Sequence, residues 1–150
     1  MAITKLIADS ITSGAIANTP AFSVKTNTGK TLEHDTITKL TFNTETFDTD
    51  NAFASDKFTV PSGKAGKYFF YASWQTSTGT DFSQQRIYIY VNGTAVDPSN
   101  QIFHDSYGST TISKILDLSA SDYAEVYAYH NRGSSIGTLG TEVFQGYKLI

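Results

Sequence analysis

The stretch that most constrains the fold runs from Phe58 to Trp74 and reads FTVPSGKAGKYFFYASW. Its first residues favour a strand, which should end at Pro61 because proline has no N–H to donate to a neighbouring strand. Gly63 and Gly66 then permit the backbone of a turn at little steric cost. The most concentrated aromatic run in the chain follows, so a second strand is expected to begin at Lys67.

Both faces of this second strand carry aromatic side chains. Successive side chains of a strand point to opposite faces. One face therefore receives Tyr68, Phe70, Ala72 and Trp74, and the other receives Lys67, Phe69, Tyr71 and Ser73. Neither set has the polar composition of a sheet face that points into solvent. We expect one face to lie in the core of a sandwich and the other to be covered, in one interpretation by another subunit.

Other segments alternate in the same way and predict further short strands. The predicted strands are residues 21–27, 36–43, 84–91, 110–118, 123–130 and 143–150, and the predicted loops are 47–53, 77–83, 97–109 and 131–140. Asn92-Gly93 is a strong signal for a hairpin turn. A run of short strands separated by turns is typical of an all-β antiparallel sandwich.

Composition narrows the functional classes. Of the 150 residues, 17 % are charged, and the net charge is -3 without a basic run. This argues against a nucleic-acid partner held by phosphate contacts. The absence of cysteine excludes disulfides and thiol chemistry. No apolar run approaches the roughly 20 residues of a membrane-spanning helix, so no membrane insertion is expected. One domain is the natural count for this length.

Residues 1–20 differ from the rest and are expected to form an N-terminal arm ahead of a domain at 21–150. The arm has no aromatic residue, and its apolar residues at helical spacing are Ile3, Leu6, Ile7 and Ile11. A short isolated helix is marginal in water. One hypothesis is a docking arm that orders against another protein, and the alternative is a frayed terminus or a short added strand. Polar residues interrupt the stretch before Ala15-x-Ala17, so a signal peptide is not expected.

Motifs for catalysis are weak. The histidines His34, His104 and His130 lack the spacing of metal ligands. His104, Asp105 and Ser106 are adjacent, and adjacent side chains on a strand point to opposite faces, which is not the geometry of a catalytic triad. We therefore expect a protein without enzymatic activity and without an obligatory cofactor.

One acidic segment offers a candidate metal site. Asp48, Asp50 and Asn51 carry hard oxygen ligands of the kind that calcium prefers. Neither the glycine nor the terminal glutamate of an EF-hand loop follows. The alternative interpretation is a solvated acidic loop.

The order of these pieces resembles the globular head of complement C-one-q, a jelly-roll domain related to tumour necrosis factor. The resemblance covers residues 21–150. It rests on Ala21-Phe22-Ser23, on Leu40-Thr41-Phe42-Asn43, on a signature at Phe58, Thr59, Pro61, Gly66, Tyr68 and Phe70, on Asn92-Gly93, and on Phe144, Gly146, Tyr147, Leu149 and Ile150. The chain departs from the pattern at the Ser121-Asp122 turn, at Ala124, and in the longer spacer after Pro61.

This resemblance implies a jelly-roll topology and a homotrimer with aromatic side chains at the contacts about a three-fold axis. The candidates for that interface are Tyr71, Tyr88, Tyr127 and Tyr129, because they lie opposite the inward aliphatic face of their strands. A monomer could not easily leave two sheet faces of tyrosine and phenylalanine in water. The alternative for each tyrosine is a place on a solvated sheet.

The arm and the stretch TFNTETFDTDNAF at 41–53 are similar to versions of this domain in structural proteins of tailed bacteriophages, especially marine ones. This similarity implies a virion protein, a trimeric head-decoration or fibre module attached to capsid or tail proteins through its arm. The protein would be made in the host cytoplasm, and its loops would contact a host-surface glycan or protein. The alternative is a secreted or cell-surface bacterial module of the same fold that recognises glycan or protein outside the cell.

Overall fold

Every regular element that the structure describes is a strand. The computed structural model describes residues 18–77, 82–103 and 108–149. Its strands are β1 (Ala21–Lys25), β2 (Thr31–Leu32), β3 (Thr38–Lys39), β4 (Thr44–Asp48), β5 (Phe53–Ala54), β6 (Lys57–Thr59), β7 (Gly66–Gln75), β8 (Phe82–Val91), β9 (Thr94–Phe103), β10 (Ser109–Leu118), β11 (Tyr123–His130), β12 (Ile136–Gly137) and β13 (Val143–Lys148). The all-β class predicted from the sequence is confirmed. Within these residues no helix is long and apolar enough to cross a lipid bilayer.

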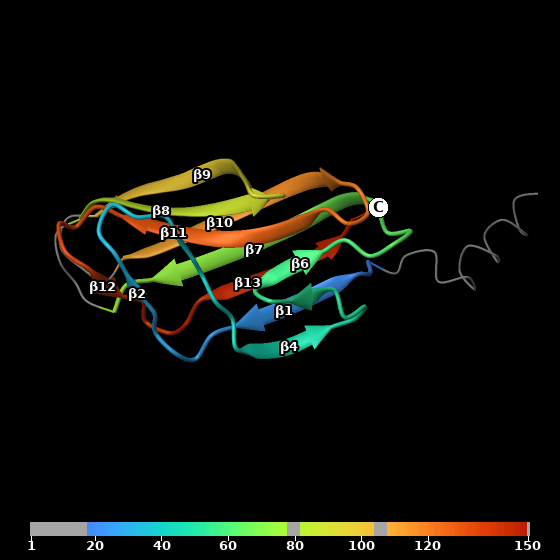
Figure 1. Ribbon diagram of the computed structural model, residues 1–150, viewed down its shortest axis with the longest axis horizontal. Coiled ribbons are helices and arrows are strands. Elements are labelled where there is room, and N and C mark those ends of the chain that lie inside the picture. The colour runs from blue at the N-terminus through green and yellow to red at the C-terminus, as the bar shows by residue number, and fades with distance from the viewer. Residues whose placement is uncertain (1–17, 78–81, 104–107, 150) are drawn as a thin grey trace, which may run out of the picture.

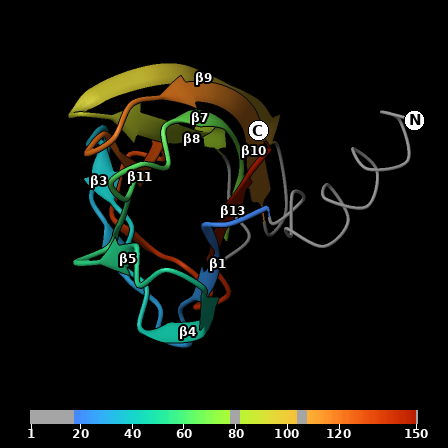
Figure 2. The same cartoon turned by 90° about the vertical axis from the view of Figure 1, so that its right-hand side faces the viewer.

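The strands form an antiparallel sandwich of two main sheets (Figure 1). The five-stranded sheet has the order β10-β7-β13-β1-β4, and the second sheet has the order β5-β6-β11-β8-β9, with β3 also paired to β11. The short pair β12-β2 lies at one end of the sandwich. Figure 2 shows how the two sheets curve round a common interior. The chain crosses between the two sheets from β7 to β8, from β9 to β10 and from β10 to β11, and β1 pairs with β13 from the far end of the chain, as in a jelly roll.

Strand β7 confirms the alternation predicted for it. Tyr68, Phe70, Ala72 and Trp74 are buried on its inner face, whereas Phe69, Tyr71 and Ser73 are half-buried on its outer face. The buried polar atoms have partners: Trp74 Nε1 donates to the carbonyl oxygen of Arg86 at 3.0 Å, and the Tyr68 hydroxyl donates to that of Lys64 at 2.6 Å. These bonds satisfy the two polar groups that burial would otherwise penalise.

A cluster of phenylalanine rings joins the two sheets. The ring of Phe22 lies 4.9 Å from those of Phe58 and Phe144 and 6.3 Å from that of Phe70. Phe58 belongs to the second sheet, and the other three belong to the five-stranded sheet. All four side chains are buried. Because burying one such side chain contributes about 1.5–3 kcal/mol, this cluster is a major apolar link between the sheets.

The strand predicted at 36–43 is confirmed only at Thr38–Lys39, which form β3. Only Thr38–Lys39 pair with β11, after which the Leu40 N–H donates to the Val126 carbonyl oxygen at 2.9 Å. The pairing stops there because β6 occupies the same edge of β11 further along, at Tyr123 and Ala124. The predicted facing of the side chains still holds, since Leu40 is buried and Phe42 packs against the core.

Two predicted loops contain edge strands. Residues 44–48 form β4, so the loop predicted at 47–53 is shorter than expected, and residues 94–103 form β9 rather than a turn-rich segment. Edge strands are often polar and carry weak patterns, because one of their edges faces solvent. Pro98 lies in β9 where the pairing with β8 shifts register between Ile87 and Ile89, and an edge strand tolerates proline at such an irregularity.

The hairpin turn at Asn92-Gly93 is confirmed. Both residues have positive φ angles, 51° and 78°, as a type I′ turn requires. The Asn92 side chain also holds the neighbouring turn, because its Nδ2 donates to Asp122 at 2.7 Å and its Oδ1 accepts from the Tyr123 N–H at 3.0 Å.

Gly146 should be essential to the packing of the core. It lies between Phe22 and Phe70 in the register of the sheet, and a Cβ there would lie 2.6 Å from Phe70 Cδ1 and 2.8 Å from the carbonyl oxygen of Phe69. We expect Gly146→Ala to lower the free energy of unfolding by about 1–3 kcal/mol, measured by urea denaturation. The exposed neighbour provides the control: Gln145→Ala should change it by less than about 0.5 kcal/mol. Equal effects of the two substitutions would contradict this role.

Candidate functional site

The outer face of the five-stranded sheet exposes large apolar side chains. The residues of this apolar face are Phe47, Phe69, Tyr71, Ile115 and Tyr147, from β4, β7, β10 and β13. Ile115 is 62 % exposed, Phe47 48 % and Tyr147 37 %. The register places Phe69 opposite both Ile115 and Tyr147, so these side chains form one row across three strands. A contiguous exposed apolar patch is typical of a contact surface.

A hollow opens within the apolar face. It has a volume of about 400 Å³, and its lining includes Ala21, Phe47, Phe69, Gln145 and Tyr147. The rings of Phe69 and Tyr147 lie 5.5 Å apart on one side of it. Because most of this lining is apolar, the hollow suits an apolar side chain of a partner better than a charged ligand.

The outer face of the second sheet differs in chemistry. The residues of this tyrosine face are Tyr88, Tyr90, Tyr123, Tyr127 and Tyr129, from β8 and β11. The rings of Tyr90 and Tyr127 lie 4.2 Å apart, and the Arg86 guanidinium lies 5.5 Å from the ring of Tyr129. Tyrosine hydroxyls can form hydrogen bonds with water, and a nearby guanidinium is charged. Exposing such a surface to water therefore costs less free energy than exposing an aliphatic surface.

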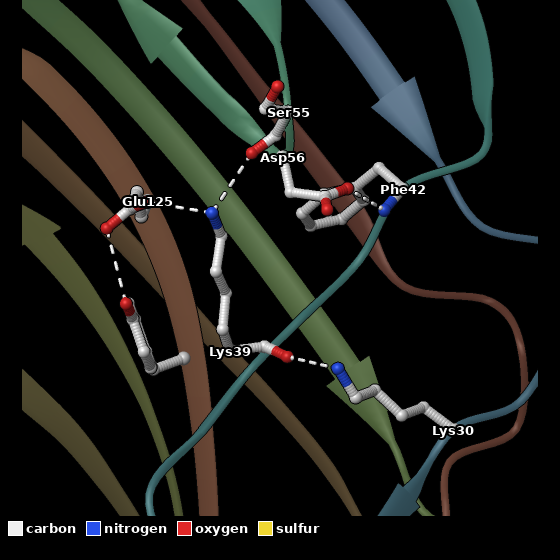
Figure 3. A network of polar contacts seen from close by, with 7 residues as sticks. Lys30, Lys39, Phe42, Ser55, Asp56 and Glu125 are labelled. Carbon is white, nitrogen blue, oxygen red and sulfur yellow. Dashed lines mark hydrogen bonds and ion pairs between the residues drawn. The ribbon is translucent and has the colours of Figure 1, made fainter.

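Lys39 lies beside Glu125 of β11 and makes polar contacts with several segments of the chain (Figure 3). Its Nζ donates to Glu125 Oε1 at 2.7 Å and to the carbonyl oxygen of Ser55 at 3.0 Å, and its own carbonyl accepts from Lys30 Nζ at 2.8 Å. Glu125 also accepts from the Tyr127 hydroxyl at 3.2 Å. Burial and the Glu125 carboxylate raise the pKa of Tyr127, which keeps this hydroxyl a neutral donor.

The structure does not bring the four predicted interface tyrosines together. Tyr71 lies on the apolar face, whereas Tyr88, Tyr127 and Tyr129 lie on the opposite outer face of the sandwich. Tyr88 is already buried within the chain at 6 % exposure. The four candidates therefore belong to two different outer faces of the sandwich. The place of each in an interface stays a prediction.

The predicted calcium ligands share one turn, but their carboxylates accept hydrogen bonds from other groups of that turn. Asp48 Oδ2 accepts from the Phe53 N–H at 2.7 Å, and Asp50 Oδ2 accepts from the Thr49 hydroxyl at 2.7 Å. Asn51 has a φ of 49° there. Throughout 18–77, 82–103 and 108–149, no three His, Cys, Asp or Glu side chains are grouped to hold a metal ion. These contacts fit a structured acidic turn, and calcium binding stays a prediction.

Other predicted residues lie outside the described part of the chain. These are the arm residues Ile3, Leu6, Ile7 and Ile11, the His104-Asp105-Ser106 run, and parts of the loops at 77–83 and 97–109. The loop at 131–140 is described and contains β12.

The sequence analysis assigned no interface role to Phe47, Phe69, Ile115 or Tyr147. Strand alternation places Phe69 on the outer face of β7, and the same rule would place Ile115 opposite Ile112 and Tyr147 opposite Phe144. Alternation alone does not show that these side chains are neighbours. That depends on the pairing of β10 and β13 with β7.

The Lys39–Glu125 ion pair should contribute more to stability than the exposed pair Lys67–Asp117. The Glu125 side chain is 11 % exposed, whereas that of Asp117 is 72 % exposed. We expect Glu125→Gln to lower the free energy of unfolding by about 1–2 kcal/mol, because Lys39 loses its charged partner. Asp117→Asn should change it by less than about 0.5 kcal/mol. Chemical denaturation of the two variants checks this, and a larger effect of Asp117→Asn would refute the ranking.

No known protein-family model matches the sequence, and no curated protein matches it. Solved structures do match. The chain is similar to the globular domain of a zebrafish complement 1qA protein at 18 % identity and a TM-score of 0.61, over 87 % of this chain and 98 % of that one. It is also similar to the Eiger tumour necrosis factor of S. frugiperda at 13 % identity and a TM-score of 0.65, over 87 % and 92 % of the two chains. At these identities the similarity shows the fold alone, an antiparallel β-sandwich with jelly-roll topology.

Proposed function

We propose that this chain is a non-enzymatic binding module that works as a homotrimer, and that it decorates the head or forms a fibre of a tailed phage. The observation that supports a trimer is the exposed apolar face. Its five large side chains belong to one sheet, and three of them are more than one-third exposed. An exposed surface of this kind needs a partner.

A neighbouring copy is the partner that this proposal assigns. Full burial of a side chain of this size contributes about 1.5–3 kcal/mol, and the members of the apolar face, each already partly buried within its own copy, would gain part of this when a neighbour covers them. In a closed ring, every copy covers the apolar face of the next, and no face stays open. The resemblance of the sequence to the complement head favours three copies over two.

Ile115→Glu tests this assignment. Ile115 is the most exposed member of the apolar face, so a glutamate there should leave a single copy folded. In the trimer it would place a charge without a partner in each contact, at a cost of about 3–5 kcal/mol. We expect light scattering to give three times 16.4 kDa for the unchanged protein and a mixture shifted towards 16.4 kDa for the variant at low micromolar concentration.

Ile37→Glu is the matched control. Ile37 is 45 % exposed but precedes β3, away from the apolar face. This variant should keep the mass of the unchanged protein. A trimer that survives Ile115→Glu, or dissociates equally in both variants, would refute the apolar face as the interface. A stable monomer of the unchanged protein would refute the trimer itself.

The place in a virion is the second part of the proposal. It is supported by the similarity of residues 1–20 and 41–53 to phage structural proteins. The described chain begins at Asn18, which lines the hollow in the apolar face. Asn18, near the C-terminal end of the proposed arm, therefore lies beside this face.

Deletion of residues 1–20 tests attachment. We expect the truncated protein to remain a folded trimer that no longer incorporates into particles, because the module is held by the arm. Incorporation is measured by mass spectrometry of purified virions from cells that also make the full chain. Normal incorporation of the truncated protein would exclude the arm as the attachment element.

The tyrosine face favours recognition as the activity of the module. It lies on the outer side of the other sheet, opposite the apolar face. Tyrosine and arginine are enriched where binding energy concentrates in interfaces. A secreted or cell-surface module that recognises glycan or protein would use the same surface. It would need no arm to act, which distinguishes it from the virion protein.

A further inference from the structure

Two histidine rings hold consecutive backbone amides of the loop after β11. The Arg132 N–H donates to Nδ1 of His130 at 3.3 Å, and the Gly133 N–H donates to Nδ1 of His34 at 2.9 Å. His130 is the last residue of β11, whereas His34 follows β2. The loop is thus fastened from two separate segments, at the end of the sandwich that carries β2 and β12 (Figure 1).

The hydrogen-bond partners determine the protonation state of both rings. His130 Nε2 lies 3.1 Å from the carbonyl oxygen of Leu32, which can only accept, so Nε2 carries the hydrogen. A backbone N–H can only donate, so Nδ1 of His130 carries none. The same reasoning leaves Nδ1 of His34 without a hydrogen. Both imidazoles therefore hold the loop only in their neutral form.

The loop has a defined movable part. Asn131 is anchored by groups that do not titrate, because its N–H donates to the Gln84 carbonyl at 3.2 Å and its Oδ1 accepts from the Gln84 N–H at 2.7 Å. At the other end, Ile136 and Gly137 pair with β2. Between these anchors lie residues 132–135, of which Gly133, Ser134 and Ser135 are exposed.

The surroundings of His130 oppose its protonation. Burial lowers the pKa of His130, while the bond to Leu32 acts in the opposite direction. The charged and titratable groups that act on the ring are Glu33 and His34 after β2 and Arg132 of the loop. Its register partner on β8 is the neutral Gln85. Since the unfolded ring has the ordinary pKa of 6.5 and the folded ring a lower one, acidification below about 6.5 destabilises the conformation that holds it neutral.

We propose that residues 132–135 form a pH-operated latch, closed by hydrogen bonds to Nδ1 of His34 and of His130 and opened when the ring of His130 takes up a proton. A protonated imidazole carries hydrogens on both nitrogens, so its Nδ1 would meet the backbone N–H as a second donor. The hydrogen bond is then lost and the two hydrogens repel each other. The segment opens between its anchors while both sheets keep their pairing. Release of a ligand held by this loop would rest on the proposed function, whereas the latch does not.

A nitroxide label on Ser134→Cys tests the latch. The chain has no cysteine, so the label is unique, and Ser134 is exposed. The spectrum is recorded by electron paramagnetic resonance from about pH 7.5 to pH 5. We expect the mobile fraction to rise several-fold below about pH 6.5, reversibly, because protonation of His130 removes the acceptor of the Arg132 N–H. A label on Ser62→Cys, in the turn before β7 at the other end of the sandwich, should not change.

Two substitutions at the exposed His34 separate the latch from general loosening. His34→Ala removes one acceptor, so the mobile fraction at Ser134 should already be raised at pH 7.5. His34→Asn offers an amide oxygen in place of Nδ1, so at pH 7.5 the mobile fraction should stay close to that of the unchanged protein. An unchanged Ser134 spectrum at pH 5, an equal change at Ser62, or a His34→Ala variant as immobile as the parent at pH 7.5 would each overturn the proposal.

Discussion

The packing of phenylalanine rings between the sheets is the constraint on which the rest of this structure depends. Phe22 contacts Phe144 within its own sheet and Phe58 of the other sheet, and Gly146 leaves the space that the ring of Phe70 occupies. These contacts fix which side of each strand points inward. Because side chains alternate along a strand, they also fix which side chains point outward. The two outer faces therefore follow from how the core is packed.

The two outer faces differ in chemistry, so the two sides of the sandwich are suited to different contacts. The apolar face gains most from leaving water, since it combines exposed aliphatic and aromatic carbon with a hollow of about 400 Å³. The tyrosine face holds its polar atoms in local partnerships, such as the Tyr127–Glu125–Lys39 contacts. A module that covers the first face and presents the second would expose the chemistry that tolerates water while it binds.

The two ends of the sandwich also differ. The phenylalanine cluster gives way, at the end that carries β2 and β12, to buried polar side chains such as Gln85 and His130. Among the described residues, the buried Gln85 Oε1, Thr110 Oγ1 and both carboxylate oxygens of Glu142 have no hydrogen-bond partner. Buried polar atoms without partners lower local stability. Local opening therefore costs less free energy at this end, where His34 and His130 hold residues 132–135.

Local patterns in the sequence determined the strands of the core, their inward faces and the turn at Asn92-Gly93, because alternation and turn chemistry act over a few neighbouring residues. Tyr71 could be placed on an outer face for the same reason. The tertiary structure alone decided that Tyr88, Tyr127 and Tyr129 lie on the other side of the molecule. It also decided that Ile115, Phe69 and Tyr147 form one row.

The edge strands β4 and β9 were not predicted, because the pattern of their own residues does not indicate a strand. Their strand conformation depends on pairing with β1 and β8. His34 and Gly133 are separated by 99 positions, and only the pairing of β2 with β12 and of β3 with β11 brings such residues within hydrogen-bonding distance.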